Sequence, residues 1–285
     1  MYDEPVIIIG AGRSGTKMLR NVLCFHPRLI TWPCDEINYI WRYGNASYPT
    51  DELGEINATP SVCKYIRRKF EKIGNSIPNS IIIEKTCANS LRIPFILKIF
   101  PKAKFIFMIR DGRDVVESAR RRWKAGIEFK YIFQKSKWIP VVDLPYYGFN
   151  FFKNRLYKIY SKENKLKRWG PIFNNLDKYL REKSLIEVCG FQWKVCVEKA
   201  EQFFDDFDKN RYLKIKYEEL VREPIYNFEK IFSHIGIELD FPLKEKIKNY
   251  VTNKNVGKWK KTLSKEDMKK LMPVIHEVLK SENYI

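Results

Sequence analysis

A glycine-rich turn near the start of the chain has the composition of an anion-binding loop. It reads GAGRSGTK at positions 10–17 and follows an apolar run. Such a turn at the start of a helix points several backbone N–H groups and the helix N-terminus at one spot, which suits a phosphate or a sulfate. Compared with the Walker pattern G-x-x-x-x-G-K-[ST], Thr16 stands in the place of the lysine and Lys17 in the place of the hydroxyl residue. The turn therefore either cradles an anion or packs a helix against a strand, and Arg13 inside it favours the cradle.

A second candidate loop, RDGRDVVES at positions 110–118, follows another apolar run. Arg110 is expected at the carboxyl end of a parallel strand, where doubly wound sheets bind ligands, and Ser118 in the first turns of the next helix. The two side chains could converge on one anion. Taken alone, the same run also fits a solvated turn with internal Asp–Arg pairs.

Both loops require strands and helices that alternate along the chain. Apolar, β-branched runs suited to burial on both faces of a sheet, each followed by a helical pattern, predict parallel βαβ units. The expected strands are Val6–Ile9, Ser80–Ile83, Phe105–Ile109 and Tyr212–Ile215. The expected helices run from about Thr16 to Phe25, over Ser90–Phe100, after Asp111–Asp114, and over Leu185–Phe207, Pro224–His234 and Ser264–Lys280. The predicted fold class is α/β, with a P-loop-like doubly wound parallel sheet flanked by helices.

Composition favours one folded unit. The chain has 285 residues, of which 45% are hydrophobic, and it contains no repeat or linker that would separate two domains. We therefore expect a single domain over residues 1–285. Residues 123–184, dense in aromatic and basic side chains, interrupt the βαβ rhythm and predict a helical insertion that binds the substrate. The same aromatic side chains could instead fill a local core.

Charge and cysteine content indicate which class of ligand and which cellular compartment to expect. The 53 Lys and Arg residues against 34 Asp and Glu residues give a net charge of +19, which favours anionic ligands, although nucleotide bias in the source genome would give the same surplus. No apolar run approaches the roughly 18 residues of a transmembrane helix, and no leader opens the chain. Six cysteines lie apart with no C-x-x-C pair, as in reduced cytosolic proteins. We expect a cytoplasmic protein without a membrane span.

The two loops and the last third of the chain resemble the sulfotransferase family, whose enzymes use 3′-phosphoadenosine 5′-phosphosulfate (PAPS). Further similar motifs are KT at 85–86, RIPF at 92–95, EVC at 187–189 with QW at 192–193, YEELV at 217–221 and GKWK at 257–260. Each motif is weak alone, but the ordered set is specific. The similarity is greatest to the bacterial and tyrosylprotein-type branch, because RSGT at 13–16 is followed by the carboxylate of Glu36.

The resemblance implies how the donor is held. The backbone of residues 12–17, with Arg13 and Thr16, would bind the 5′-phosphosulfate, and Arg110 with Ser118 would bind the 3′-phosphate that distinguishes PAPS from ATP. The implied donor-binding residues are Gly12, Arg13, Ser14, Gly15, Thr16, Lys17, Arg110, Ser118, Tyr217, Lys258 and Trp259. The implied product is adenosine 3′,5′-bisphosphate, and no metal is expected.

The resemblance also implies three catalytic residues. Lys85 would stabilise the bridging oxygen of the leaving phosphate and could protonate it, Arg13 would contact the growing charge, and Glu36 would take the proton of the acceptor hydroxyl. Without the resemblance, Lys85 reads as a strand-end lysine paired with Glu84, and Glu36 as a solvated loop carboxylate.

The expected activity is transfer of a sulfuryl group from PAPS to a hydroxyl of an acceptor. The aromatic and basic segment 123–184 favours a glycan, with a tyrosyl peptide, a lipid or a small alcohol as further acceptors. A P-loop nucleotide or sugar kinase is one alternative, but it would need a lysine at Thr16. A nonenzymatic polyanion-binding protein is another, and it leaves the ordered motifs unexplained. No specific nucleic acid partner is expected.

Overall fold

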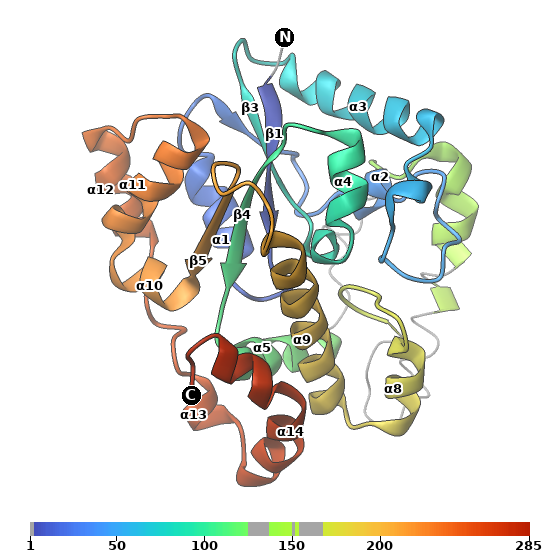
Figure 1. Ribbon diagram of the computed structural model, residues 1–285, viewed down its shortest axis with the longest axis vertical. Coiled ribbons are helices and arrows are strands. Elements are labelled where there is room, and N and C mark those ends of the chain that lie inside the picture. The colour runs from blue at the N-terminus through green and yellow to red at the C-terminus, as the bar shows by residue number, and fades with distance from the viewer. Residues whose placement is uncertain (1–2, 125–136, 150–151, 154–167) are drawn as a thin grey trace.

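A five-stranded parallel sheet forms the centre of the computed structural model, which describes residues 3–124, 137–149, 152–153 and 168–285 (Figure 1). The strands are β1 (Asp3–Ile9), β2 (Leu29–Ile30), β3 (Ile81–Lys85), β4 (Lys104–Ile109) and β5 (Tyr212–Lys216). Their order in the sheet is β2-β3-β1-β4-β5, and every neighbouring pair is parallel. The predicted doubly wound parallel sheet is confirmed.

The inner strands are buried on both faces, which explains why they are almost continuously apolar. Successive side chains of a strand point to opposite faces. Accordingly Val6 and Ile8 of β1 belong to one buried apolar cluster, and Ile7 and Ile9 belong to the other. The sheet therefore separates two cores, and helices must cover each of them.

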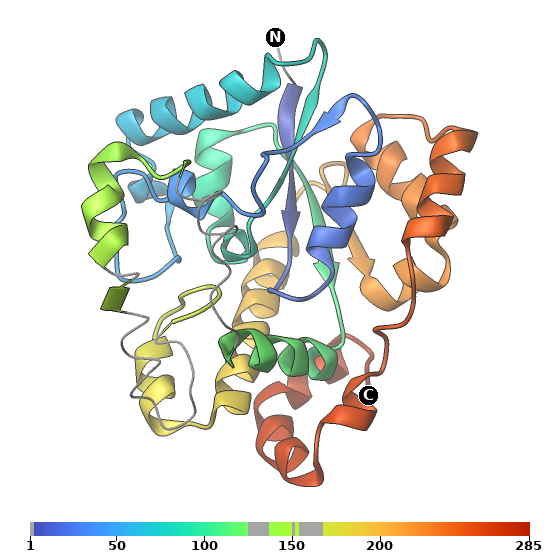
Figure 2. The same ribbon diagram turned by 180° about the vertical axis from the view of Figure 1, so that it is seen from behind.

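Helices cover both faces of the sheet (Figures 1 and 2). One core is completed by α3 (Pro60–Gly74), α4 (Ile93–Ile99), α5 (Gly112–Lys124), α9 (Leu185–Phe204) and α14 (Lys265–Ser281). The other is completed by α1 (Thr16–Leu23), α10 (Tyr217–Arg222), α11 (Pro224–Ile235) and α12 (Phe241–Tyr250). Shorter elements are α2 (Asn38–Trp41), α8 (Leu176–Glu182), α13 (Trp259–Thr262) and the 3-10 turns Glu55–Asn57, Cys87–Leu91 and Val141–Asp143. Figure 1 shows α9 in front of the sheet, and Figure 2 shows α1 in front of it.

Two expected helices differ from those in the structure. Residues 90–100 do not form a single helix, because a 3-10 turn ends at Leu91 and α4 begins at Ile93. Arg92 between them has an extended φ of −145°, and Pro94 in the first turn of α4 has no N–H to continue a helix from before it. The expected helix over 185–207 also ends earlier, at Phe204.

The predicted insertion is described only in part. Within 123–184, the structure places the 3-10 turn Val141–Asp143, a helical stretch over 144–149, and α8. Tyr131 and Phe151, two of its aromatic residues, lie outside the described residues. The single domain and the substrate-binding role of this segment remain predictions.

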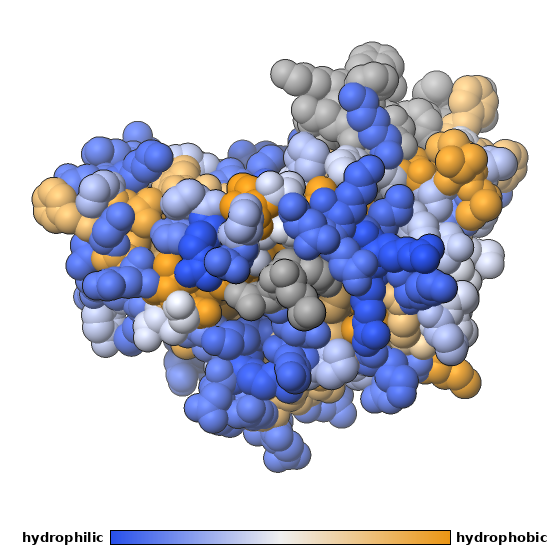
Figure 3. Space-filling model, turned by 90° about the horizontal axis from the view of Figure 1, so that it is seen from above, coloured by the Kyte–Doolittle hydropathy of each residue, from blue (hydrophilic) through white to orange (hydrophobic). Residues whose placement is uncertain are grey.

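Two further observations concern the chain as a whole. All six cysteines lie in the described part, and none of them forms a disulfide bond. Within the described residues, no helix combines the length and the apolar composition needed to cross a bilayer. Seen from above the view of Figure 1, the surface is mostly hydrophilic, with apolar residues in separate groups (Figure 3).

Candidate active site

A cavity of about 970 Å³ lies where loops leave the carboxyl ends of β1, β3 and β4. The strand order reverses at β1, and open α/β sheets bind ligands at such a switch point. Sequence-predicted residues in its lining are Gly12, Arg13, Gly15, Thr16, Lys17, Glu36, Lys85, Arg110, Ser118, Tyr217 and Lys258. The fold thus brings together residues from six separate stretches of the chain at one site.

The glycine-rich turn between β1 and α1 is built around unusual backbone geometry. Gly15 has a φ of 98°, and a Cβ there would lie 2.5 Å from the Tyr217 ring, so no other residue fits without displacement. Arg13 also has a positive φ, 78°, which is rare for a residue with a side chain and costs about 1 kcal/mol or more. Ser14 is buried, and its Oγ has no hydrogen-bond partner among the described residues. Arg13 and Gly15 line the cavity, whereas Ser14, also predicted from the sequence, does not. A strained turn of this kind is typical of ligand-binding loops.

Arg13 and Ser118 connect the first loop to the second. The Nε of Arg13 donates a hydrogen bond to the Oγ of Ser118 over 2.9 Å. Burial and the nearby charge of Arg122 lower the pKa of Arg13. An anion that entered here would relieve the repulsion between these two guanidinium groups.

Arg110 lies at the junction of both loops. One of its terminal nitrogens donates to the Arg13 carbonyl over 3.1 Å, and its guanidinium lies over the Tyr217 ring at 4.4 Å. Its buried Nε has no partner among the described residues. Arg110 is therefore held rigidly at the cavity wall with one donor unsatisfied.

Asp114 anchors a C-terminal loop beside the same wall. Its side chain is 1% exposed, lies 3.5 Å from Arg110, and accepts hydrogen bonds from the N–H groups of Gly257 (2.8 Å) and Trp259 (2.9 Å). This anchoring places Lys258 in the cavity lining. Trp259 does not line the described cavity, and its ring instead stacks against the guanidinium of Arg113 at 4.1 Å.

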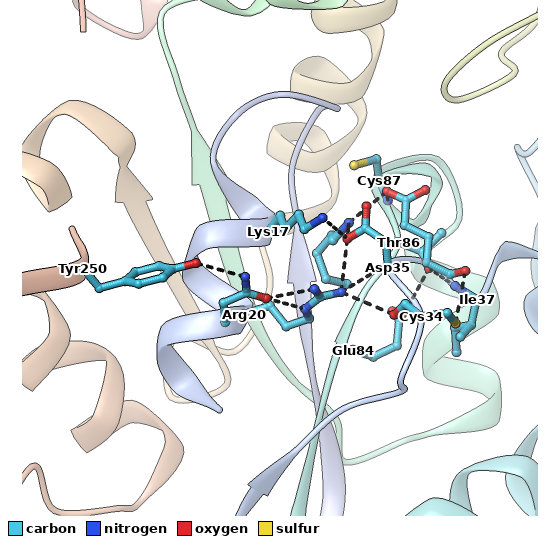
Figure 4. A network of polar contacts seen from close by, with 12 residues as sticks. Lys17, Arg20, Cys34, Asp35, Ile37, Glu84, Thr86, Cys87 and Tyr250 are labelled. Atoms are coloured by element: carbon cyan, nitrogen blue, oxygen red, sulfur yellow. Dashed lines mark hydrogen bonds and ion pairs between the residues drawn. The ribbon is translucent and has the colours of Figure 1, made fainter. Parts of the chain in front are cut away.

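Lys85 lies between two carboxylates in the lining of the cavity. Figure 4 shows the polar network around one of them, Asp35. Lys85 ends β3 with a side chain 3% exposed, and its Nζ lies 3.1 Å from both Glu36 Oε1 and Asp35 Oδ1. Lys85 thus forms ion pairs with Glu36 and Asp35, whereas the sequence alone suggested Glu84 as its partner. Burial alone would lower the pKa of Lys85, but the negative charges of Glu36 and Asp35 outweigh it and raise the pKa. Lys85 therefore stays cationic.

Asp35 is surrounded by positive charge. Besides Lys85, it accepts from Arg20 at 3.2 Å and lies 3.8 Å from Lys17, whose side chain is 61% exposed. Burial would raise the pKa of Asp35, but Lys85, Lys17 and Arg20 lower it on balance. Glu36 has a different environment, because its Oε1 also accepts from the Cys87 N–H at 3.4 Å.

Several lining residues were missed from the sequence. Arg121 and Arg122 project into the cavity from α5. Their spacing of three and four residues after Ser118 puts them on the same helical face, a signal that could have been used. Other lining residues come from distant segments, which local patterns do not connect: Asn21, Tyr39, Cys87, Trp169, Tyr250 and Asn255.

Known proteins are similar to this chain at the level of family and fold. Residues 5–136 match the model of the sulfotransferase family. A putative protein-tyrosine sulfotransferase of Caenorhabditis briggsae is 28% identical over 135 residues, which cover 42% of this chain and 44% of the relative. Protein-tyrosine sulfotransferase 1 of Danio rerio is 29% identical over 161 residues, covering 50% and 44%. The chain therefore spans less than half the length of the curated relatives it matches.

Solved structures share the fold over most of the chain. Sulfotransferase STF9 of Mycobacterium avium has a TM-score of 0.53 at 14% identity, covering 98% of this chain and 76% of that one. A mouse sulfotransferase solved in complex with PAP has a TM-score of 0.52 at 15% identity, covering 96% and 84%. At these identities the likeness shows the fold alone.

Proposed function

We propose that this chain, whose residues 5–136 match the model of the sulfotransferase family, transfers a sulfuryl group from PAPS to a hydroxyl group of an acceptor. The observation that carries this proposal is the ion pair between Lys85 and Glu36, which lies in the same cavity as the glycine-rich turn. Beside the anion-binding turn, this arrangement places a cation that can stabilise the leaving group. It also places there a carboxylate that can take the proton of the acceptor.

The residues of the cavity fit the donor's two anionic groups. The backbone of the glycine-rich turn, with the side chains of Arg13 and Thr16, would hold the 5′-phosphosulfate. Arg110 and Ser118, which both line the cavity, would hold the 3′-phosphate. Lys258 lines the same cavity and would add a further positive charge.

The mechanism follows from the charges of these side chains. Bound PAPS supplies an activated sulfuryl group whose leaving phosphate gains negative charge as the sulfur–oxygen bond breaks. Lys85, kept cationic by its carboxylate partners, stabilises that charge and can give it a proton. Glu36 accepts the proton of the acceptor hydroxyl while the hydroxyl oxygen forms its bond to sulfur. The proton taken up by Glu36 balances the one that Lys85 provides.

The acceptor enters beside aromatic side chains. Tyr39 and Trp169 line the cavity, and Tyr147 packs edge-on against Tyr39 at 4.6 Å. Such rings stack well on a phenol or on the apolar face of a sugar. The names of the curated relatives make a tyrosyl peptide the first acceptor to test, and the aromatic wall makes a glycan the second.

A transfer assay tests the proposal. The protein is incubated with PAPS that carries a radiolabelled sulfuryl group and with a panel of tyrosyl peptides, glycans, lipid headgroups and small alcohols. We expect label transfer to at least one acceptor with equal release of adenosine 3′,5′-bisphosphate, and loss of both in Lys85→Ala. Transfer that is unchanged in Lys85→Ala, or phosphate transfer from Mg-ATP to the same acceptors, would contradict it.

A further inference from the structure

Glu84 and Thr86 lie on either side of Lys85 at the end of β3 and point away from the cavity. Glu84 is 1% exposed and Thr86 is fully buried, and neither lines the cavity, whereas Lys85 does. The alternation of side chains along the strand end accounts for this. Glu84 and Thr86 are hydrogen-bonded to each other and belong to the polar network in Figure 4.

The hydrogen bonds of Glu84 fix the direction of the Thr86 hydroxyl. Thr86 Oγ1 donates its one hydrogen to Glu84 Oε1 over 2.6 Å. The other oxygen of Glu84 accepts from Asn89 Nδ2 over 2.5 Å, and the Asn89 carbonyl oxygen accepts from Arg92, which fixes the orientation of that amide. Since its hydrogen is committed to Glu84, the Thr86 oxygen can only accept from its remaining neighbour.

That neighbour is the backbone of the loop that carries Glu36. The N–H of Ile37 donates to Thr86 Oγ1 over 3.2 Å. The carboxylate of Glu36 is held from the same strand end, by Lys85 Nζ at 3.1 Å and by the Cys87 N–H at 3.4 Å. Three consecutive residues, 85–87, thus each form a hydrogen bond with the loop that contains Glu36 and Ile37.

We propose that Thr86, oriented by Glu84, is a positioning residue that holds Glu36 at its working distance from Lys85. This inference rests on the proposed function, because it assigns Thr86 a role in the step for which Glu36 is the base. Thr86 does not line the cavity, so its effect should appear in the rate of transfer and leave donor binding unchanged.

Replacement of Thr86 tests this role. Thr86→Val keeps the shape but removes the hydroxyl, and we expect kcat to fall about tenfold to a hundredfold, as for a small misplacement of a catalytic group. The KM for PAPS should stay within about twofold, since the residue lies outside the cavity lining. Thr86→Ser, which retains both hydrogen bonds, should keep kcat within about threefold of wild type. A valine variant with wild-type kcat would overturn the proposal.

Ser80→Ala is the matched control. Ser80 is a buried hydroxyl residue just before the other end of β3, and it donates to the Gly74 carbonyl over 2.7 Å. Its loss should lower Tm without changing kcat. A fall in kcat as large as that of Thr86→Val would show that the loss reflects general weakening of β3, and would overturn the positioning role.

A double variant asks whether Thr86 acts through Glu36. In a Glu36→Gln background the base is already lost, so adding Thr86→Val should reduce kcat by less than about twofold. A further tenfold loss would mean that Thr86 acts elsewhere, and would overturn the proposal.

Hydrogen exchange keeps the proposal testable if the valine variant does not fold. In the unmodified protein, the Ile37 amide should exchange as slowly as amides of β3, although it lies outside a helix or strand. Fast exchange of Ile37 would overturn the positioning contact whatever the activity. A protected Ile37 amide in a wild-type protein that transfers no sulfuryl group would instead contradict the proposed function.

Discussion

Asp35 and Glu36 are adjacent in the sequence but occupy different chemical environments. Asp35 forms ion pairs with Arg20, Lys17 and Lys85, so its negative charge is largely balanced by neighbouring side chains. Glu36 is held by Lys85 and one backbone N–H, and it lines the cavity. Both carboxylates line the cavity, and we propose that Glu36, which has fewer cationic partners, is the one that takes a proton.

We expect Glu36→Gln to lower kcat by about a hundredfold to ten-thousandfold, the usual contribution of a general base. The amide keeps a partner for Lys85 but cannot accept the acceptor's proton. Affinity for adenosine 3′,5′-bisphosphate, measured by calorimetry, should remain close to that of wild type. Wild-type kcat in this variant would exclude Glu36 as the base.

Asp35 should contribute to stability in a pH-dependent way. Its pKa in the folded protein lies below the ordinary value of 3.8 because the charges of Lys85, Lys17 and Arg20 outweigh burial. Its stabilising contribution is therefore complete well above pH 3.8 and is lost as the pH falls through the lower, folded pKa. Urea unfolding midpoints of wild type and Asp35→Asn should differ most near neutral pH and converge in acid. A difference that grows on acidification would contradict this.

Single residues also show where sequence reasoning stops. Local pattern predicts that Arg110 and Ser118 converge, and it places Arg13 in the separate glycine-rich turn. The hydrogen bond from Arg13 to Ser118 joins the two loops and was not predicted. The partner of Lys85 was not evident from local pattern, because Asp35 and Glu36 lie about fifty positions away and meet it only through strand pairing.

At the scale of elements, the glycine-rich turn depends on the close approach of α10. The Tyr217 ring, from the first residue of α10, packs against Gly15 and under Arg110. The turn, the second loop and α10 therefore form one unit. Its shape is set by the absence of a side chain at position 15.

Gly15→Ala should disrupt this unit. The left-handed φ of 98° and the clash with Tyr217 should together cost about 1–3 kcal/mol of stability. They should also weaken adenosine 3′,5′-bisphosphate binding at least about tenfold, or 1.4 kcal/mol. Gly236→Ala is a matched control, because Gly236 has a φ of 90° but no atom within 4 Å of the added Cβ. The control should lose stability and keep its affinity; equal losses of affinity in both variants would contradict the account.

The helices and strands were predictable to the extent that their patterns are local. The four expected strands are present, because each contains a short apolar run. The edge strand β5 differs from the expected burial on both faces, since only Ile215 in it is buried. The two-residue strand β2 was missed, because its pairing with β3 extends over only two positions. The break between Leu91 and Ile93 was missed because apolar spacing was given more weight than Pro94.

At the scale of the whole molecule, the chain carries a high positive charge, and part of that charge lines the cavity. The net charge is +19, and the cavity contains seven lysine or arginine side chains: Arg13, Lys17, Lys85, Arg110, Arg121, Arg122 and Lys258. Four carboxylates, Asp35, Glu36, Asp114 and Glu117, share that lining. The remaining positive field suits a donor with phosphates at both ends of its ribose.

The measurement that tests this account most directly is calorimetric titration with adenosine 3′,5′-bisphosphate and, separately, with AMP, in the absence of metal. A 3′-phosphate bound by Arg110 and Ser118 adds charge-assisted hydrogen bonds of about 1.5–3 kcal/mol, so the bisphosphate should bind at least about tenfold more tightly. Ser118→Ala should reduce the difference in affinity between adenosine 3′,5′-bisphosphate and AMP. Equal affinity for the two nucleotides, or tighter binding of Mg-ATP, would contradict the assignment of this cavity as a PAPS site.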